Sequence, residues 1–219
     1  MEPVPIGETL KPSLFSPPQI LLTLTPTRTS EHSDVRGVPL RYCQWTLADY
    51  HPGLVAKAEG WAASNLWSLY LTGVVGTRKS SFAAAILHGA GRGYFATPEK
   101  TVEKIRGFCK WWIDQAKTCS LLVVDDLGSY RATPHVHDTL LAILATRYDN
   151  FRKTIITSNA SLDEIEQWLD ARLADRLREG LAMFSGKASK RESGNPQAIT
   201  KQAVGDYLKD QKPKFTGPP

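Results

Sequence analysis

A lysine followed by two serines, Lys79-Ser80-Ser81, stands directly after a short loop that carries two glycines. Glycines let the backbone N–H groups of such a loop turn inward around phosphate oxygens. The lysine can then reach the β- and γ-phosphates of a nucleotide, while the Ser80 hydroxyl can hold Mg²⁺. An apolar run ends at Thr72 before the loop, and a segment of good helix propensity follows it. This order predicts a phosphate-binding loop. Its expected nucleotide contacts are Gly73, Gly76, Thr77, Arg78, Lys79, Ser80 and Ser81.

Arg78 occupies the position at which a phosphate-binding loop has its last glycine. A Cβ makes left-handed backbone costly, so Arg78 could strain the loop by roughly 1–2 kcal/mol. Its guanidinium could instead add a contact to phosphate. The structural alternative for the whole stretch is an ordinary glycine turn before a helix.

Two adjacent carboxylates follow the apolar run Leu121–Val124. Four consecutive apolar residues are typical of a strand buried on both faces of a parallel sheet. Ligands bind at the carboxyl ends of such strands. We therefore expect Asp125 to hold Mg²⁺ through its water shell and Asp126 to orient or deprotonate the attacking water. The alternative is that the two carboxylates lie in a plain solvated loop.

Asn159 follows a second predicted strand, the β-branched run Thr154–Thr157. A polar side chain at that strand end can donate a hydrogen bond to the γ-phosphate or the attacking water. Farther along, Arg172 and Arg176 are four residues apart and share one face of a predicted helix. They suit phosphate contact across a subunit boundary, whereas salt bridges to acidic neighbours such as Asp175 are the ordinary alternative.

Other elements are predicted from apolar runs and capping signals. Thr97-Pro98 and Thr133-Pro134 each place a cap and a first-turn proline at a helix start. Trp111 and Trp112 lie on the first of these helices, where they could stack on nucleic-acid bases or pack in the core. The remaining expected elements are helices over 54–67, 98–117 and 134–149, a capping box at Ser161, and strands over 93–96 and 181–184.

Composition and charge divide the chain into three parts. The length of 219 residues fits one core of ordinary domain size. Residues 1–38 contain six prolines and predict an extended, largely disordered arm, or a partner-binding peptide anchored at Ile20–Leu22. Residues 39–185 are the predicted domain. Residues 186–219 form a predicted basic, flexible tail that carries most of the net charge of +5, a charge compatible with nucleic acid.

The sequence offers no sign of a disulfide framework, a zinc site or a membrane segment. Three cysteines are odd in number and form no CxxC pair. The start of the chain lacks a basic and apolar leader, and the apolar run over 19–25 is too short to span a bilayer. We therefore expect a cytoplasmic protein with no membrane partner.

The order of these motifs resembles that of the AAA+ ATPases. The residues within the motifs are similar to those of one branch, the DnaC-type helicase loaders and the IstB-type transposition helpers. The resemblance covers roughly residues 41–185. The residues that carry it are Tyr42 with Thr46–Tyr50, Gly73–Ala85, Leu121–Gly128, Arg147-Tyr148, Thr154–Asn159 and Ala171–Gly180.

This resemblance implies a three-layer α/β/α P-loop domain around a parallel sheet, with ATP and Mg²⁺ bound between protomers. By position, Asn159 matches the sensor-1 residue and Arg176 the arginine finger, so Asp126, Asn159 and Arg176 are the expected catalytic residues. The implied partners are a replicative helicase or other DNA-processing protein, single-stranded DNA and further copies of the chain. Three features depart from the pattern: Arg78, the missing helical N-terminal module, and the missing lid with a second sensor arginine, for which Arg191 is a candidate.

Three functions remain open at this stage. The first is a helicase loader whose ATP hydrolysis is gated by assembly, which we favour because the block around Tyr42–Tyr50 is nearer to loaders. The second is an ATPase helper of a DNA transposase. The third is a nucleotide-binding adaptor in which Arg78 has cost hydrolysis.

Overall fold

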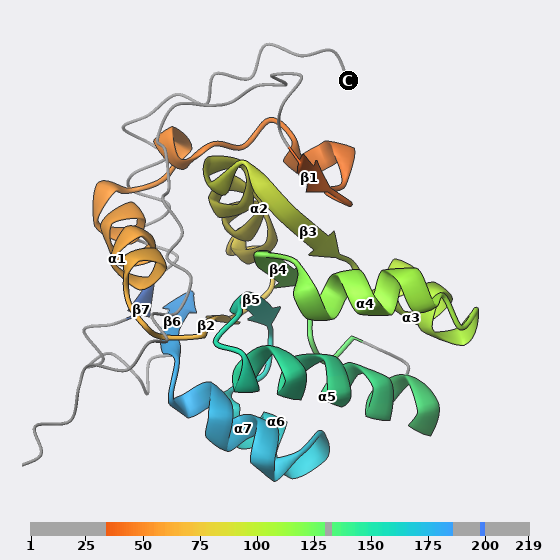
Figure 1. The fold of residues 1–219 in the computed structure, drawn as a ribbon. Helices are drawn as coiled ribbons and strands as arrows, with labels where there is room; N and C mark the ends of the chain where they lie inside the picture. Colours follow the sequence, from red (N-terminus) through yellow and green to blue (C-terminus); the bar gives the residue numbers. More distant parts are fainter. Residues whose placement is uncertain (1–33, 130–132, 186–197, 200–219) are drawn as a thin grey trace, which may run out of the picture.

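The computed structural model describes residues 34–129, 133–185 and 198–199. They form a parallel sheet with strand order β1-β3-β4-β5-β2-β6-β7 (Figure 1). The strands are β1 (Asp34–Arg36), β2 (Ser68–Gly73), β3 (Arg92–Ala96), β4 (Leu121–Val124), β5 (Lys153–Ser158), β6 (Leu181–Ser185) and β7 (Ala198–Ile199). The helices are α1 (Pro52–Ala63), α2 (Lys79–Ala90), α3 (Pro98–Arg106), α4 (Lys110–Thr118), α5 (Pro134–Asp149), α6 (Leu162–Trp168) and α7 (Ala171–Arg178), with 3₁₀ helices η1 (Leu40–Tyr42) and η2 (Leu47–Asp49).

Helices cover both faces of the sheet, because alternate strand residues point to opposite sides. On β2, Leu69 and Leu71 pack in a cluster with α1 and α2, whereas Tyr70 packs in a second cluster with α4, α5 and α7. Figure 1 shows α1 and α2 on one side of the sheet and α3–α7 on the other. The predicted three-layer α/β/α fold with a parallel sheet is confirmed.

The position of β5 organises the carboxyl edge of the sheet. This strand pairs with β4 on one side and with β2 on the other. The registers set Val124 opposite Ile156 and Thr72 opposite Ser158. The residues that directly follow β4, β5 and β2 therefore lie side by side, although they are far apart in the sequence.

The predicted single helix over 98–117 is wrong, because the chain breaks between α3 and α4. Gly107 follows the last turn of α3, and Phe108 has a positive φ of 48°, which no α-helix accommodates. Of the two tryptophans on α4, Trp112 is buried and Trp111 is 56% exposed. Core packing, expected for at least one of the two tryptophans, is confirmed for Trp112.

The sheet extends beyond the predicted domain limits of residues 39 and 185. β1, at residues 34–36, pairs with β3, and Gly37 follows with a φ of 82°. A Cβ on Gly37 would meet the Phe95 carbonyl oxygen at 2.3 Å, so the end of the predicted arm is held tightly against the sheet. At the other end, β7 pairs with β6. The anchor expected at Ile20–Leu22 and most of the predicted tail lie outside the described residues.

Two buried cations fix the opposite, amino edge of the sheet. The Arg147 guanidinium donates hydrogen bonds to the Thr154 hydroxyl (2.8 Å) and to the carbonyls of Ala116 (2.9 Å) and Cys119 (3.0 Å). Lys153 Nζ donates to three carbonyls at the end of α1, at 2.7–2.9 Å. Burial lowers the pKa of Arg147 to about 10. Arg147 is one of the residues that carry the family resemblance. Its role in this structure is to connect α4 to β5 through hydrogen bonds.

Candidate functional site

The loop between β2 and α2 has the backbone geometry of a phosphate cradle. Gly73 and Gly76 have positive φ angles of 135° and 83°, and Arg78 has a φ of 63° immediately before α2 begins at Lys79. The Thr77 hydroxyl donates a hydrogen bond to the Val74 carbonyl (2.9 Å) and so closes the loop on itself. The N-terminus of α2 therefore opens on the loop, where its free N–H groups favour an anion.

Lys79 Nζ lies at the mouth of this loop. It donates hydrogen bonds to the carbonyls of Gly73 (2.7 Å) and Val74 (3.0 Å) and to Oδ1 of Asn159 (3.0 Å). Burial lowers the pKa of Lys79, and the nearby carboxylates of Asp126 and Asp125 act against that shift. The ammonium is thus held by neutral acceptors that the oxygens of a triphosphate can replace.

Thr157 joins the two carboxylates that follow β4. Its hydroxyl donates to Asp125 Oδ1 (2.7 Å) and accepts a hydrogen bond from the Asp126 backbone N–H (2.8 Å). The Ser80 hydroxyl lies close enough to act on the same carboxyl. Burial raises the pKa of Asp125, whereas these two hydroxyls lower it. Ser80 and Asp125 consequently present two oxygen groups to one another at the predicted Mg²⁺ position.

Asp126 is linked to Lys79 through Asn159. Asn159 Nδ2 donates to Asp126 Oδ1 (3.3 Å), while Asn159 Oδ1 accepts from Lys79. Ser129 hydrogen-bonds the other carboxylate oxygen of Asp126. Asp126 has a φ of 50°, a left-handed conformation that places this half-buried carboxylate beyond the end of β4. A chain of three polar groups therefore runs along the carboxyl edge of the sheet.

Apart from Gly73, the predicted nucleotide contacts line one pocket of about 390 Å³. Among those that line it are Gly76, Thr77, Arg78, Lys79, Ser80, Ser81, Asp126 and Asn159. The donor set fits ATP with Mg²⁺, because Mg²⁺ takes one or two protein oxygens and fills its other positions with water and phosphate. Within the described residues there is no cluster of three or more His, Cys, Asp or Glu side chains that could hold a metal by themselves.

The Arg78 side chain packs on Trp45. Its guanidinium lies 4.5 Å from the centre of the Trp45 ring, and its Nη1 is buried without a hydrogen-bond partner. The Ser81 hydroxyl donates to the Arg78 carbonyl (3.0 Å), which helps to hold the left-handed turn. The left-handed backbone at Arg78 is therefore supported by contacts within the fold.

Arg78→Gly is expected to leave the ATP affinity within about threefold of wild type, because the Arg78 guanidinium packs on Trp45 and is not needed for phosphate contact. Equilibrium titration with a fluorescent ATP analogue measures the affinity, and Arg92→Ala, a change to an exposed arginine on β3, is the control. A tenfold loss in the glycine variant would assign the guanidinium to a phosphate contact.

The structure does not bring Arg176 to this pocket. Arg176 pairs with Asp149 at the end of α5 (3.8 Å), lies over the Tyr148 ring (4.8 Å), and accepts through its carbonyl a hydrogen bond from the Trp67 indole (2.8 Å). Trp67 directly precedes β2, whereas Lys79 follows it. A strand of six residues spans roughly 20 Å, so Arg176 is too far away to touch a phosphate held by Lys79 of its own chain. Arg172 is exposed on the same helix.

Sequence reasoning missed three side chains of the site. Thr157 and Ser129 hold the carboxylates, and Trp45 holds Arg78. The β-branched run predicts only a strand position for Thr157, although a hydroxyl one residue before a strand end is a recognisable signal. For Trp45 there is no local signal, because its contact with the loop depends on how the chain before α1 folds back.

Comparisons with known proteins bear on the fold of this domain. No protein family profile matches the chain, and no curated protein matches it in sequence. A solved structure of the DnaC helicase loader superposes with a TM-score of 0.58 at 22% identity, over 66% of this chain and 98% of that one. DnaI gives a TM-score of 0.58 at 20% identity, over 69% and 96%. The replication initiator DnaA bound to AMPPCP and single-stranded DNA gives 0.58 at 18% identity, over 79% and 60%.

The chain has an AAA+ fold. The loop after β2, the carboxylates after β4 and the asparagine after β5 lie together at the carboxyl edge of its sheet. Within the described part of the chain, no helix is both long enough and apolar enough to cross a membrane.

Proposed function

We propose that this AAA+ protein binds and hydrolyses ATP with Mg²⁺ and acts in DNA replication as a helicase loader. The observation that carries the proposal is the hydrogen-bonded chain Lys79–Asn159–Asp126 at the mouth of the phosphate loop. Its three members come from three different elements, and only the insertion of β5 between β4 and β2 brings them together. A glycine turn or a solvated Asp-Asp pair would not need this convergence.

Each residue of the site has a distinct part in the hydrolysis that we propose. Ser80 and Asp125 would hold Mg²⁺, which would supply positive charge to offset that of the phosphates. Asp126 accepts a proton from the attacking water, and Asn159 fixes the direction of the Asp126 carboxylate through Nδ2. Lys79 stabilises the negative charge that develops on the terminal phosphate.

The distance of Arg176 from the pocket supports hydrolysis that depends on assembly. A lone chain has its loop, carboxylates and asparagine in place, but Arg176 lies at the amino edge of the sheet, next to Asp149. Arginines supplied by a neighbouring molecule are known to complete phosphoryl-transfer sites. We infer that Arg176 serves the ATP site of the next copy in an oligomer.

An exposed aromatic turn supports contact with single-stranded DNA. Phe108 and Trp111, at the α3–α4 turn, are 75% and 56% exposed. Lys110 lies between them in sequence and Lys104 is one turn earlier on α3. Aromatic rings beside basic side chains bind single strands by base stacking and charge. The similarity to DnaA, which was solved with single-stranded DNA, and to the DnaC helicase loader is in accord with this proposal.

Single-stranded DNA is expected to stimulate ATP turnover by the wild-type chain, and Asp126→Asn is expected to abolish turnover in either condition. Trp111→Ala should weaken binding of an oligothymidine by about fivefold or more, because stacking on one ring contributes ~1–3 kcal/mol. Phe151→Ala is the matched control, since Phe151 is similarly exposed at the α5–β5 turn. Fluorescence anisotropy and phosphate release measure the two effects.

Three results would decide between the functions. Stimulation of ATP turnover by single-stranded DNA, together with delivery of a replicative helicase onto that DNA, supports the helicase-loader function. Stimulation of ATP turnover by duplex DNA and a transposase would instead support the transposition-helper function. ATP binding without turnover in any of these conditions would make the chain a nucleotide-binding adaptor.

A further inference from the structure

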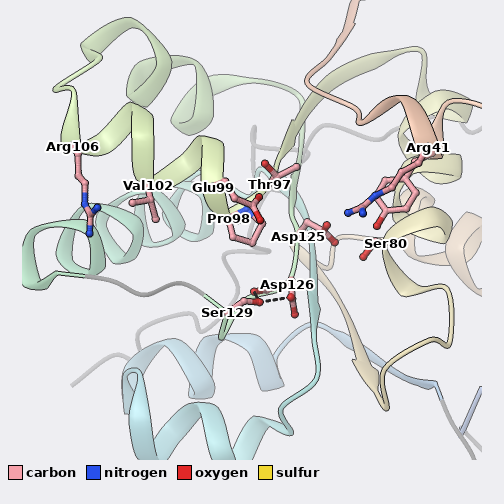
Figure 2. Close-up of a pocket in the computed structure, with 11 residues that line it drawn as sticks. Arg41, Ser80, Thr97, Pro98, Glu99, Val102, Arg106, Asp125, Asp126 and Ser129 are labelled. Atoms are coloured by element: carbon pink, nitrogen blue, oxygen red, sulfur yellow. Dashed lines mark hydrogen bonds between the residues drawn. The ribbon is translucent and has the colours of Figure 1, made fainter.

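A second pocket of about 520 Å³ adjoins the nucleotide pocket on the far side of Asp125. The two pockets share Tyr42, Ser80 and Asp126 as lining residues, so they are neighbours. Figure 2 shows the second pocket, with Asp125 and Asp126 at its centre and the start of α3 along one side. The end of the site where the γ-phosphate and Mg²⁺ are expected is thus open toward α3 and η1.

Arg41 faces Asp125 across this second pocket. Its guanidinium points from η1 toward Asp125 and Ser80, whereas Arg106 lies at the other end of the pocket (Figure 2). The Arg41 guanidinium, a cation from outside the phosphate loop, therefore lies on the side of the site where Mg²⁺ is expected.

The backbone around Arg41 is held in place by the fold. Tyr42 N–H donates to the Pro39 carbonyl (2.8 Å), Cys43 N–H donates to the Leu40 carbonyl (3.1 Å), and the Tyr42 ring packs on Phe95 of β3. The Arg41 guanidinium lies 4.8 Å from the centre of the Tyr42 ring. No hydrogen bond or ion pair occupies this guanidinium among the described residues, so its donors can serve a ligand in the pocket.

The lining residues also indicate which part of a nucleotide Arg41 would meet. Arg41 shares its pocket with Ser80, Asp125 and Asp126, and not with Val75–Arg78, the loop segment that surrounds the inner phosphates. Two carboxylates close to the terminal phosphate oppose its negative charge, and a guanidinium can offset that repulsion with paired hydrogen bonds.

We propose that Arg41 binds the terminal phosphate of ATP from the side opposite Lys79 and thereby distinguishes ATP from ADP. This inference rests on the proposed function, since it assumes nucleotide in the phosphate loop. It assigns to the segment before α1 a contact that only the triphosphate can make.

The test compares affinities for AMPPCP and ADP, each with Mg²⁺, by isothermal titration calorimetry. Arg41→Ala is expected to weaken AMPPCP binding by about tenfold or more while ADP affinity stays within twofold. Arg41→Lys should recover part of the loss because it keeps the charge without the planar fork. Arg106→Ala, at the far end of the same pocket, should change neither affinity.

Each outcome of this test bears on one proposal. If Arg41→Ala lowers both affinities equally, or lowers neither, Arg41 does not contact the terminal phosphate and the inference is wrong. A wild-type chain that binds neither nucleotide would overturn the proposed function instead. Thermal unfolding of all variants without nucleotide shows whether a loss of affinity comes from a damaged fold.

Discussion

Lys79→Ala is expected to weaken ATP binding by at least about 100-fold, because charge-assisted hydrogen bonds to phosphate contribute ~1.5–3 kcal/mol each and Lys79 can donate several. Lys79 is half-buried at the loop mouth, where its present acceptors are two carbonyls and Asn159. Calorimetric titration with AMPPCP measures the change. The same variant should lose all turnover.

Lys57→Ala is the control for this experiment. Lys57 is exposed on α1, at a distance from the pocket, so its removal lowers the net charge equally without touching the loop. Circular dichroism checks that both variants fold. Equal AMPPCP affinity in wild type and Lys79→Ala would mean that the nucleotide is not bound at this loop.

Local signals in the sequence predicted the elements that carry the site. The run Leu121–Val124 is β4 and Thr133-Pro134 starts α5, because a continuous apolar run and a capped proline start act through neighbours in sequence. The capping box at Ser161 is present as predicted. The break between α3 and α4 was not predicted, since Phe108 adopts a positive φ that its residue type does not favour.

The convergence of the site could be expected only from the family resemblance. That Asn159 meets both Lys79 and Asp126 depends on β5 lying between β2 and β4, and strand order is a property of the whole chain. Arg41 and Trp45 reach the site because residues 34–36 pair with β3 and the segment before α1 then crosses the carboxyl edge. No spacing or periodicity in those residues predicts this path.

Arg176→Ala is expected to keep ATP affinity within about twofold of wild type and to lose roughly 10³-fold of the turnover seen on assembly. The residue lies a strand length from its own pocket, so its removal leaves the loop contacts intact. A finger acts on charge that develops during the reaction, and for that reason its loss appears in rate and not in binding. Arg172→Ala, on the exposed face of α7, should show a milder loss.

Asp149→Ala separates a finger from a structural ion pair. In the free chain Arg176 pairs with Asp149 at 3.8 Å, and both side chains are partly exposed. Such a pair contributes ~0–1 kcal/mol to stability. If Arg176 acts as a finger, Asp149→Ala frees it and turnover stays near wild type. If the ion pair is what matters, Asp149→Ala reproduces the loss seen in Arg176→Ala.

Mixing two inactive variants tests whether Arg176 acts on a neighbouring copy. The Lys79→Ala, Asp125→Ala double variant lacks a working ATP site but retains Arg176, whereas Arg176→Ala retains the site and lacks the finger. Head-to-tail assembly pairs an intact site with an intact finger at some interfaces, so a mixture should recover part of the wild-type turnover. Native mass spectrometry confirms that the two variants assemble together. If a co-assembled mixture stays as inactive as its components, Arg176 is not a finger, and its role is structural, in the contact between α7 and α5.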